Sequence, residues 1–87
     1  MKINILKKEK NELEIEMDNL TIAELLRNEL WNDEGVELSA WRRENPSKDP
    51  ILVLKTKSKD AKKALFDAID RIKGKNKEIL KEFKKVF

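Results

Sequence analysis

The sequence predicts an α+β fold, in which a four-stranded and mostly antiparallel sheet carries two helices on one face as a two-layer sandwich. Four short segments have the apolar patterns of strands, and two segments have apolar residues at helical spacing. Their order along the chain is strand, strand, helix, strand, strand, helix, and the last helix is long. The 87 residues suffice for a single domain, residues 1–87, and are too few for two.

The first two strands are predicted by alternation. Residues 1–5 alternate apolar and polar side chains, and residues 12–18 do so again with an acidic residue at every second position. The polar run Lys7 to Asn11 between them predicts the connection of a β-hairpin with one solvated face. The acidic row can meet Lys2 and neighbouring lysines across the strand pair, and a solvated face explains it better than catalytic carboxylates do.

The first helix is predicted over Leu20 to Leu30. Thr21 followed three residues later by Glu24 predicts a capping box at its start. A full apolar stripe runs along one side, with Trp31 and Ala23 off it, which suggests a helix with two neighbours: its own sheet and another chain. The stripe consists of Ile22, Leu25, Leu26 and Leu30.

Two more strands follow this helix. Gly35 is predicted to supply a positive φ that ends the helical segment, and Val36 to Trp41 then alternates as the third strand. The segment Arg42 to Pro50 holds both prolines and is predicted as a loop. Ile51 to Thr56 is a continuous apolar run, so we expect it at a central place in the sheet.

From Asp60 to the end the chain has one helical pattern, with Ser58 or Asp60 as candidate caps. About 28 residues at ~1.5 Å each give a helix of roughly 40 Å, and this exceeds the ~17–20 Å of typical strands. A small sheet cannot cover such a helix, so its far half needs another cover. The alternative is that Gly74 ends the helix and a separate short helix follows.

The composition restricts the chemistry. The chain has 43% charged residues, a net charge of +3, no cysteine and no histidine. We therefore expect no disulfides, no catalytic site, no metal site and no cofactor, because the usual ligands and acid–base groups are absent. No long apolar run and no export leader is present, so a cytoplasmic protein without a membrane segment is expected.

Direct nucleic-acid binding is the weaker interpretation of the lysine-rich C-terminal region. Glu78 and Glu82 interrupt the basic stripe, as on an ordinary solvated helix. Trp31 and Trp41 can stack on bases, but the aromatic and glycine motifs of common RNA-binding modules are absent. The stripe comprises Lys73, Lys75, Lys77, Lys81, Lys84 and Lys85.

An interface with another protein is the stronger interpretation. The apolar residues at the end of the last helix would form a patch of several hundred Å² if they were exposed, a size typical of protein interfaces. The alternative is that this part of the helix folds back onto its own sheet. The residues concerned are Ile79, Leu80, Phe83, Val86 and Phe87.

Over nearly its whole length the chain resembles archaeal RNA polymerase subunit L, a family related to the dimerisation portion of the bacterial alpha subunit. The family's first helix commonly opens with His-Thr-Leu, a small residue, Asn, Leu, Leu and Arg. Thr21, Leu25, Leu26 and Arg27 match this pattern, whereas the His and the Asn are replaced. Further matches are the strand before Asn45-Pro46, where Asn replaces His, and the pair Lys55-Thr56 before an alanine-rich helix.

The resemblance implies a non-catalytic subunit of DNA-directed RNA polymerase. It would form a heterodimer with the larger alpha-like polymerase subunit, named D, and serve as an assembly platform for the catalytic subunits in transcription. Catalytic aspartates and magnesium would belong to other chains, and nucleic acid would be met only through the assembled enzyme. The partner interface is predicted at Thr21, Leu25, Leu26, Arg27, Leu30, Trp31, Ile72, Ile79, Leu80, Phe83 and Phe87.

Two other classes remain open at this point. An unrelated α+β interaction module would self-associate and ignore the alpha-like subunit. A small nucleic-acid-binding protein would bind polyanions with an affinity that falls steeply with salt.

Overall fold

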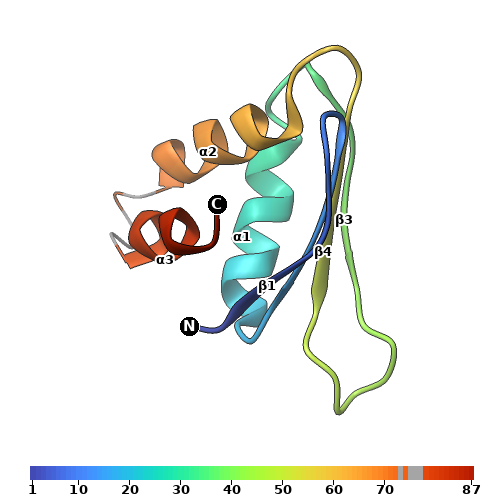
Figure 1. Cartoon of the computed structure of the whole chain (residues 1–87), viewed down its shortest axis with the longest axis vertical. Helices are drawn as coiled ribbons and strands as arrows, with labels where there is room; N and C mark the ends of the chain where they lie inside the picture. Colours follow the sequence, from blue (N-terminus) through green and yellow to red (C-terminus); the bar gives the residue numbers. More distant parts are fainter. Residues whose placement is uncertain (73, 75–77) are drawn as a thin grey trace.

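The computed structural model of the chain describes residues 1–72, 74 and 78–87 (Figure 1). The α+β class and the element order are confirmed, except that the chain ends in two helices where one was predicted. The elements are β1 (Ile3–Glu9), β2 (Glu12–Met17), α1 (Leu20–Leu30), β3 (Val36–Arg42), β4 (Ile51–Thr56), α2 (Ala61–Ile72) and α3 (Glu78–Val86).

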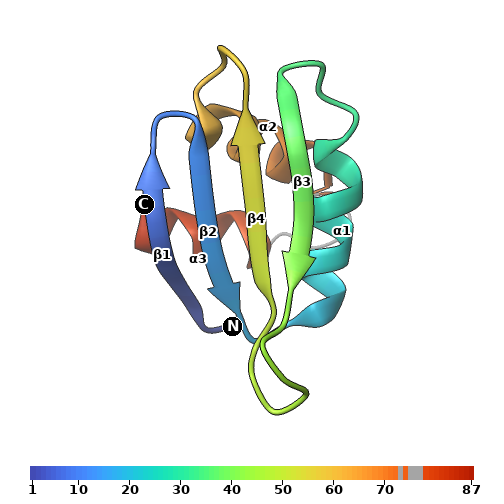
Figure 2. The same ribbon diagram turned by 90° about the vertical axis from the view of Figure 1, so that its right-hand side faces the viewer.

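The four strands form one antiparallel sheet in the order β1-β2-β4-β3 (Figure 2). β4 lies between two partners, so the central place predicted from its continuous apolar run is confirmed. The helices α1, α2 and α3 lie on one face of the sheet, and over the described residues the other face carries no helix (Figure 1). The result is the predicted two-layer arrangement.

The first hairpin is tighter than predicted. β1 continues to Glu9, and Lys10 and Asn11 alone separate it from β2, so the predicted connection Lys7 to Asn11 was too long. The reason is that strand pairing continues past the apolar residues: Lys8 pairs with Leu13 and Glu9 with Glu12. On the solvated sheet face, Lys7 Nζ is 3.2 Å from a carboxylate oxygen of Glu12. An ion pair between neighbouring strands stabilises the strand pairing even where the side chains face solvent.

The core lies between the sheet and the helix layer. Alternate residues of β2 and β4 point into it, and each helix contributes its apolar stripe. The largest side chains with less than 2% exposure are Phe83, Leu13, Ile15, Met17, Leu26, Leu30, Leu52, Leu54, Leu65, Ile69 and Ile79. Burial of these side chains is the main favourable term in the folding free energy.

Asn19 caps α1, and the capping box predicted at Thr21 and Glu24 is wrong. Asn19 has extended backbone angles, and its side-chain Oδ1 accepts a hydrogen bond of 3.0 Å from the Ile22 N–H. Thr21 is therefore a helical residue with an exposed side chain. Both residue types cap helices well, so the sequence alone could not decide between positions two residues apart.

Replacing Asn19 by alanine is expected to lower the free energy of unfolding by about 0.5–2 kcal/mol, because the first turn of α1 loses its cap. Replacing Thr21 by alanine is the matched control and should change stability by no more than about 0.5 kcal/mol. Urea denaturation of both variants measures the difference. A larger loss at Thr21 than at Asn19 would contradict the observed cap.

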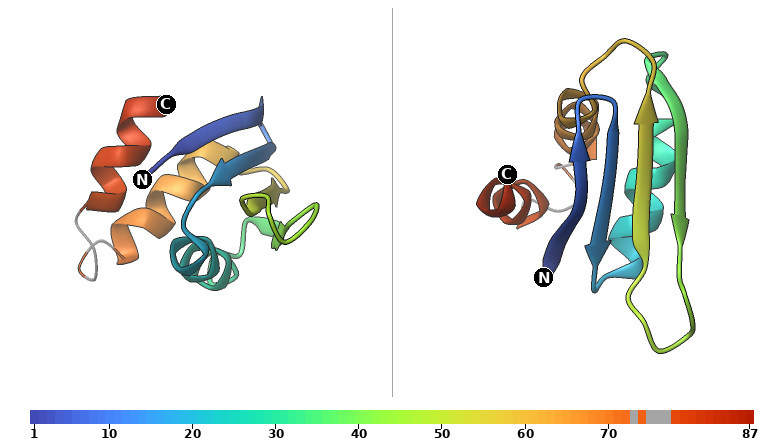
Figure 3. Two further views of the ribbon diagram at one scale, coloured as in Figure 1. Left: turned by 90° about the horizontal axis from the view of Figure 1, so that it is seen from below. Right: turned by 45° about the vertical axis from the view of Figure 1, so that its right-hand side comes forward.

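The single long C-terminal helix is replaced by α2 and α3, which corresponds to the alternative with a break near Gly74. The reason is burial: α3 folds back beside α2 (Figure 3), and this places Ile79 and Phe83 in the same core as the sheet. A continuous helix would carry both side chains beyond the sheet. Of the two candidate caps of α2, Asp60 is confirmed, since its carboxylate accepts the Lys62 N–H at 2.9 Å.

Gly35 follows α1 as predicted, but its φ is not positive, so that part of the prediction is wrong. Its role is steric instead. A Cβ atom at this position would lie 3.1 Å from the Lys59 Cβ and 3.2 Å from the Lys59 Cδ. Gly35 therefore allows the loop after α1 to approach the segment between β4 and α2.

Candidate interaction surface

Five of the predicted interface residues are buried inside the chain itself. None of them is more than 3% exposed, and all belong to the core described above. A side chain in this position cannot meet a partner in the observed conformation, although it supports the surface above it. The five are Leu26, Leu30, Ile72, Ile79 and Phe83.

The other six predicted residues reach the surface to different extents. Thr21 and Trp31 are exposed, Trp31 to 48%, and Arg27 is half-buried. The remaining three are partly buried hydrophobic residues that pack against the core and keep one side toward solvent: Leu25, Leu80 and Phe87. The structure thus separates the predicted set into a buried support and an accessible part.

A polar cluster fixes the side of α1 that faces β3. The Arg27 guanidinium donates to both carboxylate oxygens of Glu24, at 2.8 and 3.1 Å, and the Trp41 indole N–H donates to the same carboxylate. These bonds, chiefly the one from Arg27, lower the pKa of Glu24, and Glu24 in turn raises the pKa of Arg27. Ser39, which is buried, donates from its hydroxyl to the Arg27 carbonyl at 2.9 Å.

Two large apolar side chains stand at opposite ends of α1. Leu20 is 40% exposed at the first helical position, and Trp31 follows the last one. The predicted interface did not include Leu20, because Leu20 is not part of the apolar stripe of the predicted helix. With the cap at Asn19, Leu20 belongs to the helix surface. α1 therefore presents an outer side with apolar ends and a rigid charged centre.

The C-terminal end of α1 is locked to α2 by ion pairs. Lys59 Nζ contacts Asp33 after α1 and, at 2.8 Å, Asp67 in α2. Arg71 of α2 donates to the Glu29 side chain and to its carbonyl oxygen. The Lys59 hydrogen bond is the main cause that holds the pKa of both Asp33 and Asp67 below the usual range. Trp31 thus projects from a segment that is held on both sides.

Acid is expected to weaken this lock. Because the folded pKa values of Asp33 and Asp67 are depressed, the unfolded chain binds more protons as the pH falls. Their contribution to stability is therefore complete above about pH 5 and is lost as the pH falls from about 4 through the folded values. Urea unfolding at pH 7 and at several lower pH values measures the loss.

Lys59→Met should reduce this acid dependence, because the carboxylates lose their shared cation. Lys57→Met is the matched control, since Lys57 is exposed and forms no ion pair within the described residues, and it should keep the acid dependence of the parent chain. Equal acid dependence in Lys59→Met and the parent would show that other groups cause it.

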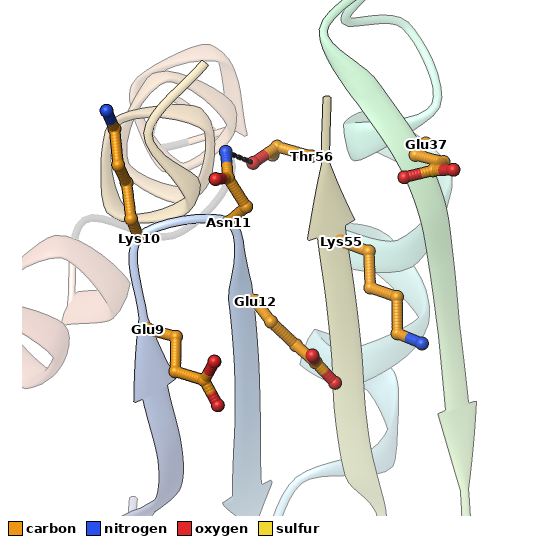
Figure 4. Close-up of a pocket in the computed structure, with 7 residues that line it drawn as sticks. All are labelled: Glu9, Lys10, Asn11, Glu12, Glu37, Lys55 and Thr56. Atoms are coloured by element: carbon orange, nitrogen blue, oxygen red, sulfur yellow. Dashed lines mark hydrogen bonds between the residues drawn. The ribbon is translucent and has the colours of Figure 1, made fainter. Parts of the chain in front are cut away.

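The hollow at the tip of the first hairpin has a structural role. It encloses about 330 Å³, and its charged side chains spread over the solvated sheet face (Figure 4). Asn11 Nδ2 donates to Thr56 Oγ1 and to the Lys59 carbonyl, both at 3.1 Å, which ties the hairpin to the end of β4. The lining residues are Glu9, Lys10, Asn11, Glu12, Glu37, Lys55 and Thr56.

The described residues give little evidence of a metal site, a membrane-spanning helix or a nucleic-acid site. Within them, acidic side chains do not gather in groups of three or more that could hold a metal ion. No helix in that part of the chain is long and apolar enough to cross a membrane. The predicted basic stripe falls partly on Lys73, Lys75 and Lys77, which lie outside the described residues.

Known proteins match this chain along nearly its full length. The family model of the RNA polymerase Rpb3/Rpb11 dimerisation domain matches residues 10–82. DNA-directed RNA polymerase subunit Rpo11 of Methanothrix thermoacetophila is 36% identical over 86 residues, which cover 95% of this chain and 94% of that protein. Subunit Rpo11 of Saccharolobus solfataricus is 36% identical over 88 residues, with 97% and 96% covered.

The fold also matches a solved structure. A crystal structure of DNA-directed RNA polymerase subunit L from Thermoplasma acidophilum superimposes with a TM-score of 0.74 and 22% sequence identity. The match covers 97% of this chain and 86% of that one, and it confirms the fold class.

Proposed function

This chain belongs to the RNA polymerase Rpb3/Rpb11 dimerisation domain family, and on that premise we propose that it is subunit L, the Rpb11-like subunit, of an archaeal DNA-directed RNA polymerase. The observation that carries the proposal is the 36% identity to two Rpo11 subunits of nearly equal length. Residues 1–87 then act as one dimerisation domain without a catalytic site of its own. It works in the cytoplasm as part of a nucleotidyltransferase whose chemistry other chains perform.

The proposed partner is the larger alpha-like polymerase subunit, named D, and the pair serves as an assembly platform for the catalytic subunits. The contact begins at the outer side of α1, where Trp31 and Leu20 are exposed and Arg27 is held by Glu24. Aromatic and arginine side chains are enriched at such interfaces, and a prearranged side chain loses little entropy on binding. Thr21 and Leu25 extend this surface, and the buried Leu26 and Leu30 of the same helix support it from below. Leu80 of α3 and the C-terminal Phe87 stand outside this contact, because α3 packs on β1 and α2 and Lys8 of β1 lies over the Phe87 ring.

Co-expression with the alpha-like subunit of the same organism tests the proposal. We expect the two chains to purify together as a 1:1 complex at micromolar concentration, which size-exclusion chromatography with light scattering measures. The complex should persist at moderate salt, because the contact is mainly apolar. Separate elution of the two chains, with this chain forming a homodimer or binding RNA in a salt-sensitive manner, would overturn the proposal.

A further inference from the structure

A small groove with an apolar floor lies between α2 and α3. It encloses about 240 Å³ and is lined by Lys62 and Phe66 of α2, by Lys84 of α3, and by Phe87. The two phenylalanine rings meet edge to face, with their centroids 5.5 Å apart and their planes at 80°. The floor is therefore a fixed aromatic surface rather than a gap between flexible side chains.

The rim of the groove is basic. Lys62 and Lys84 belong to the lining, and the Lys8 Nζ lies 5.5 Å from the centroid of the Phe87 ring. All three lysines are exposed, and over the described residues none of them forms an ion pair, unlike Lys63 with Asp67 and Lys85 with Glu82. Three lysines without an ion pair in the described part of the chain thus lie beside one apolar floor, and the adjoining hollow carries Glu9 and Asp60 next to Lys8, Lys10 and Lys62.

We propose that this groove binds an acidic peptide segment of a partner polypeptide, with one aliphatic or aromatic side chain on the phenylalanine floor and neighbouring carboxylates on the lysines. The volume suits one or two side chains and is below the ~300–1000 Å³ of typical small-molecule pockets. The exposed lysines would also attract such a segment before contact, because opposite charges steer association.

The aromatic geometry favours a peptide over nucleic acid. Stacking of a base requires an open ring face. In the groove Lys8 lies over the Phe87 ring, and Phe66 meets Phe87 edge to face. The basic residues also form a cluster around one cavity, whereas a phosphate backbone is bound along an extended track.

The groove is separate from the proposed contact with the alpha-like subunit. Lys8 of β1 lies over Phe87 at the rim of the groove, and β1 is one edge strand of the sheet. The helix α1 lies beside β3, the strand at the opposite edge (Figure 2). A third chain could therefore reach the groove while the outer side of α1 is paired. Peptide binding in the groove does not depend on the proposed function. A negative peptide-binding result would not contradict pairing with the alpha-like subunit, and failure of that pairing would not contradict peptide binding.

Fluorescence anisotropy of the full chain with a labelled peptide tests the proposal. The probe is a short peptide with glutamates on both sides of a Phe-Leu pair. We expect saturable binding at low salt. A peptide with glutamine in place of glutamate should bind about tenfold more weakly, because it lacks the carboxylates that pair with the lysines. A peptide with alanine in place of Phe and Leu should also bind about tenfold more weakly, because it lacks the side chains that pack on the phenylalanine floor.

A matched pair of charge-reversal variants locates the binding site. Lys62→Glu with Lys84→Glu should weaken binding of the parent peptide about tenfold or more. Lys48→Glu with Lys57→Glu changes the net charge equally at exposed lysines outside the groove and should weaken it by less than about threefold. Circular dichroism should show the same helix content in both variants.

Three results would overturn the proposal. The first is an equal loss of binding in the two charge-reversal variants, and the second is equal binding of the glutamine peptide. The third is tighter binding of a single-stranded oligothymidine than of the peptide, with an oligothymidine affinity that falls in the Lys62→Glu, Lys84→Glu variant. That result would show that the groove binds nucleic acid.

Discussion

Replacing Phe83 by alanine is expected to lower the free energy of unfolding by about 3–5 kcal/mol, the range for truncation of a buried phenylalanine. Phe83 is 0% exposed and is the largest fully buried side chain in the described part of the chain. Its removal leaves a cavity where α3 packs against the core. Since domains of this size are stable by only about 5–15 kcal/mol, urea denaturation should show a large shift of the midpoint.

Val86→Ala is the matched control for this change. Val86 lies on the same helix but is 38% exposed, so its truncation should change stability by about 0.5 kcal/mol or less. If Phe83→Ala unfolded at the same urea concentration as the parent, α3 would not pack on the core in solution. Phe83 would then be free to face a partner along a continuous C-terminal helix, as the sequence pattern suggests.

The strands and the first helix could be predicted because their apolar patterns are local. α1 has the predicted limits, Leu20 to Leu30, and β4 has the predicted limits, Ile51 to Thr56. The pattern of one run is enough to show which face is buried. The cap at Asn19 was missed because Thr21 is also a good cap, and the choice depends on backbone angles that no pattern reports.

The break between α2 and α3 could not be predicted in the same way. The apolar spacing runs on from Ala61 to Phe87 and is compatible with one helix or two. The difference lies in tertiary burial, because folding back covers Ile79 and Phe83 with the chain's own core. A long helix would need a second chain to bury the same residues. The pattern therefore indicates that Ile79 and Phe83 are buried, but it does not show whether the chain itself or a partner buries them.

The same ambiguity affected the interface prediction. A sequence shows that Leu26, Leu30 and Trp31 are apolar, but it does not show which of them the chain buries itself. The structure separates them: Leu26 and Leu30 are fully buried, and Trp31 is half exposed. A substitution at Leu26 or Phe83 would therefore test the fold before it tested an interface, and an informative interface variant must change an accessible residue.

Replacing Trp31 by alanine is expected to weaken the complex with the alpha-like subunit by about 2 kcal/mol or more, which is roughly a 30-fold increase in Kd. The physical reason is that a large aromatic side chain, exposed in the free chain, would lose its burial against the partner. The stability of the free chain should change by about 0.5 kcal/mol or less, because Trp31 is 48% exposed. Isothermal titration calorimetry with the purified alpha-like subunit measures the affinity, and urea denaturation measures the stability.

Leu6→Ala is the control for this effect. Leu6 is 50% exposed at the irregularity in β1, on the other flank of the molecule from α1 (Figure 2). Its removal should leave the affinity for the alpha-like subunit unchanged, because a solvent-exposed apolar residue outside the contact contributes nothing to it. An unchanged Kd in Trp31→Ala, or a larger loss in Leu6→Ala, would move the dimer contact away from α1 toward the β1 side. The two variants together therefore decide which flank of the helix layer meets the partner.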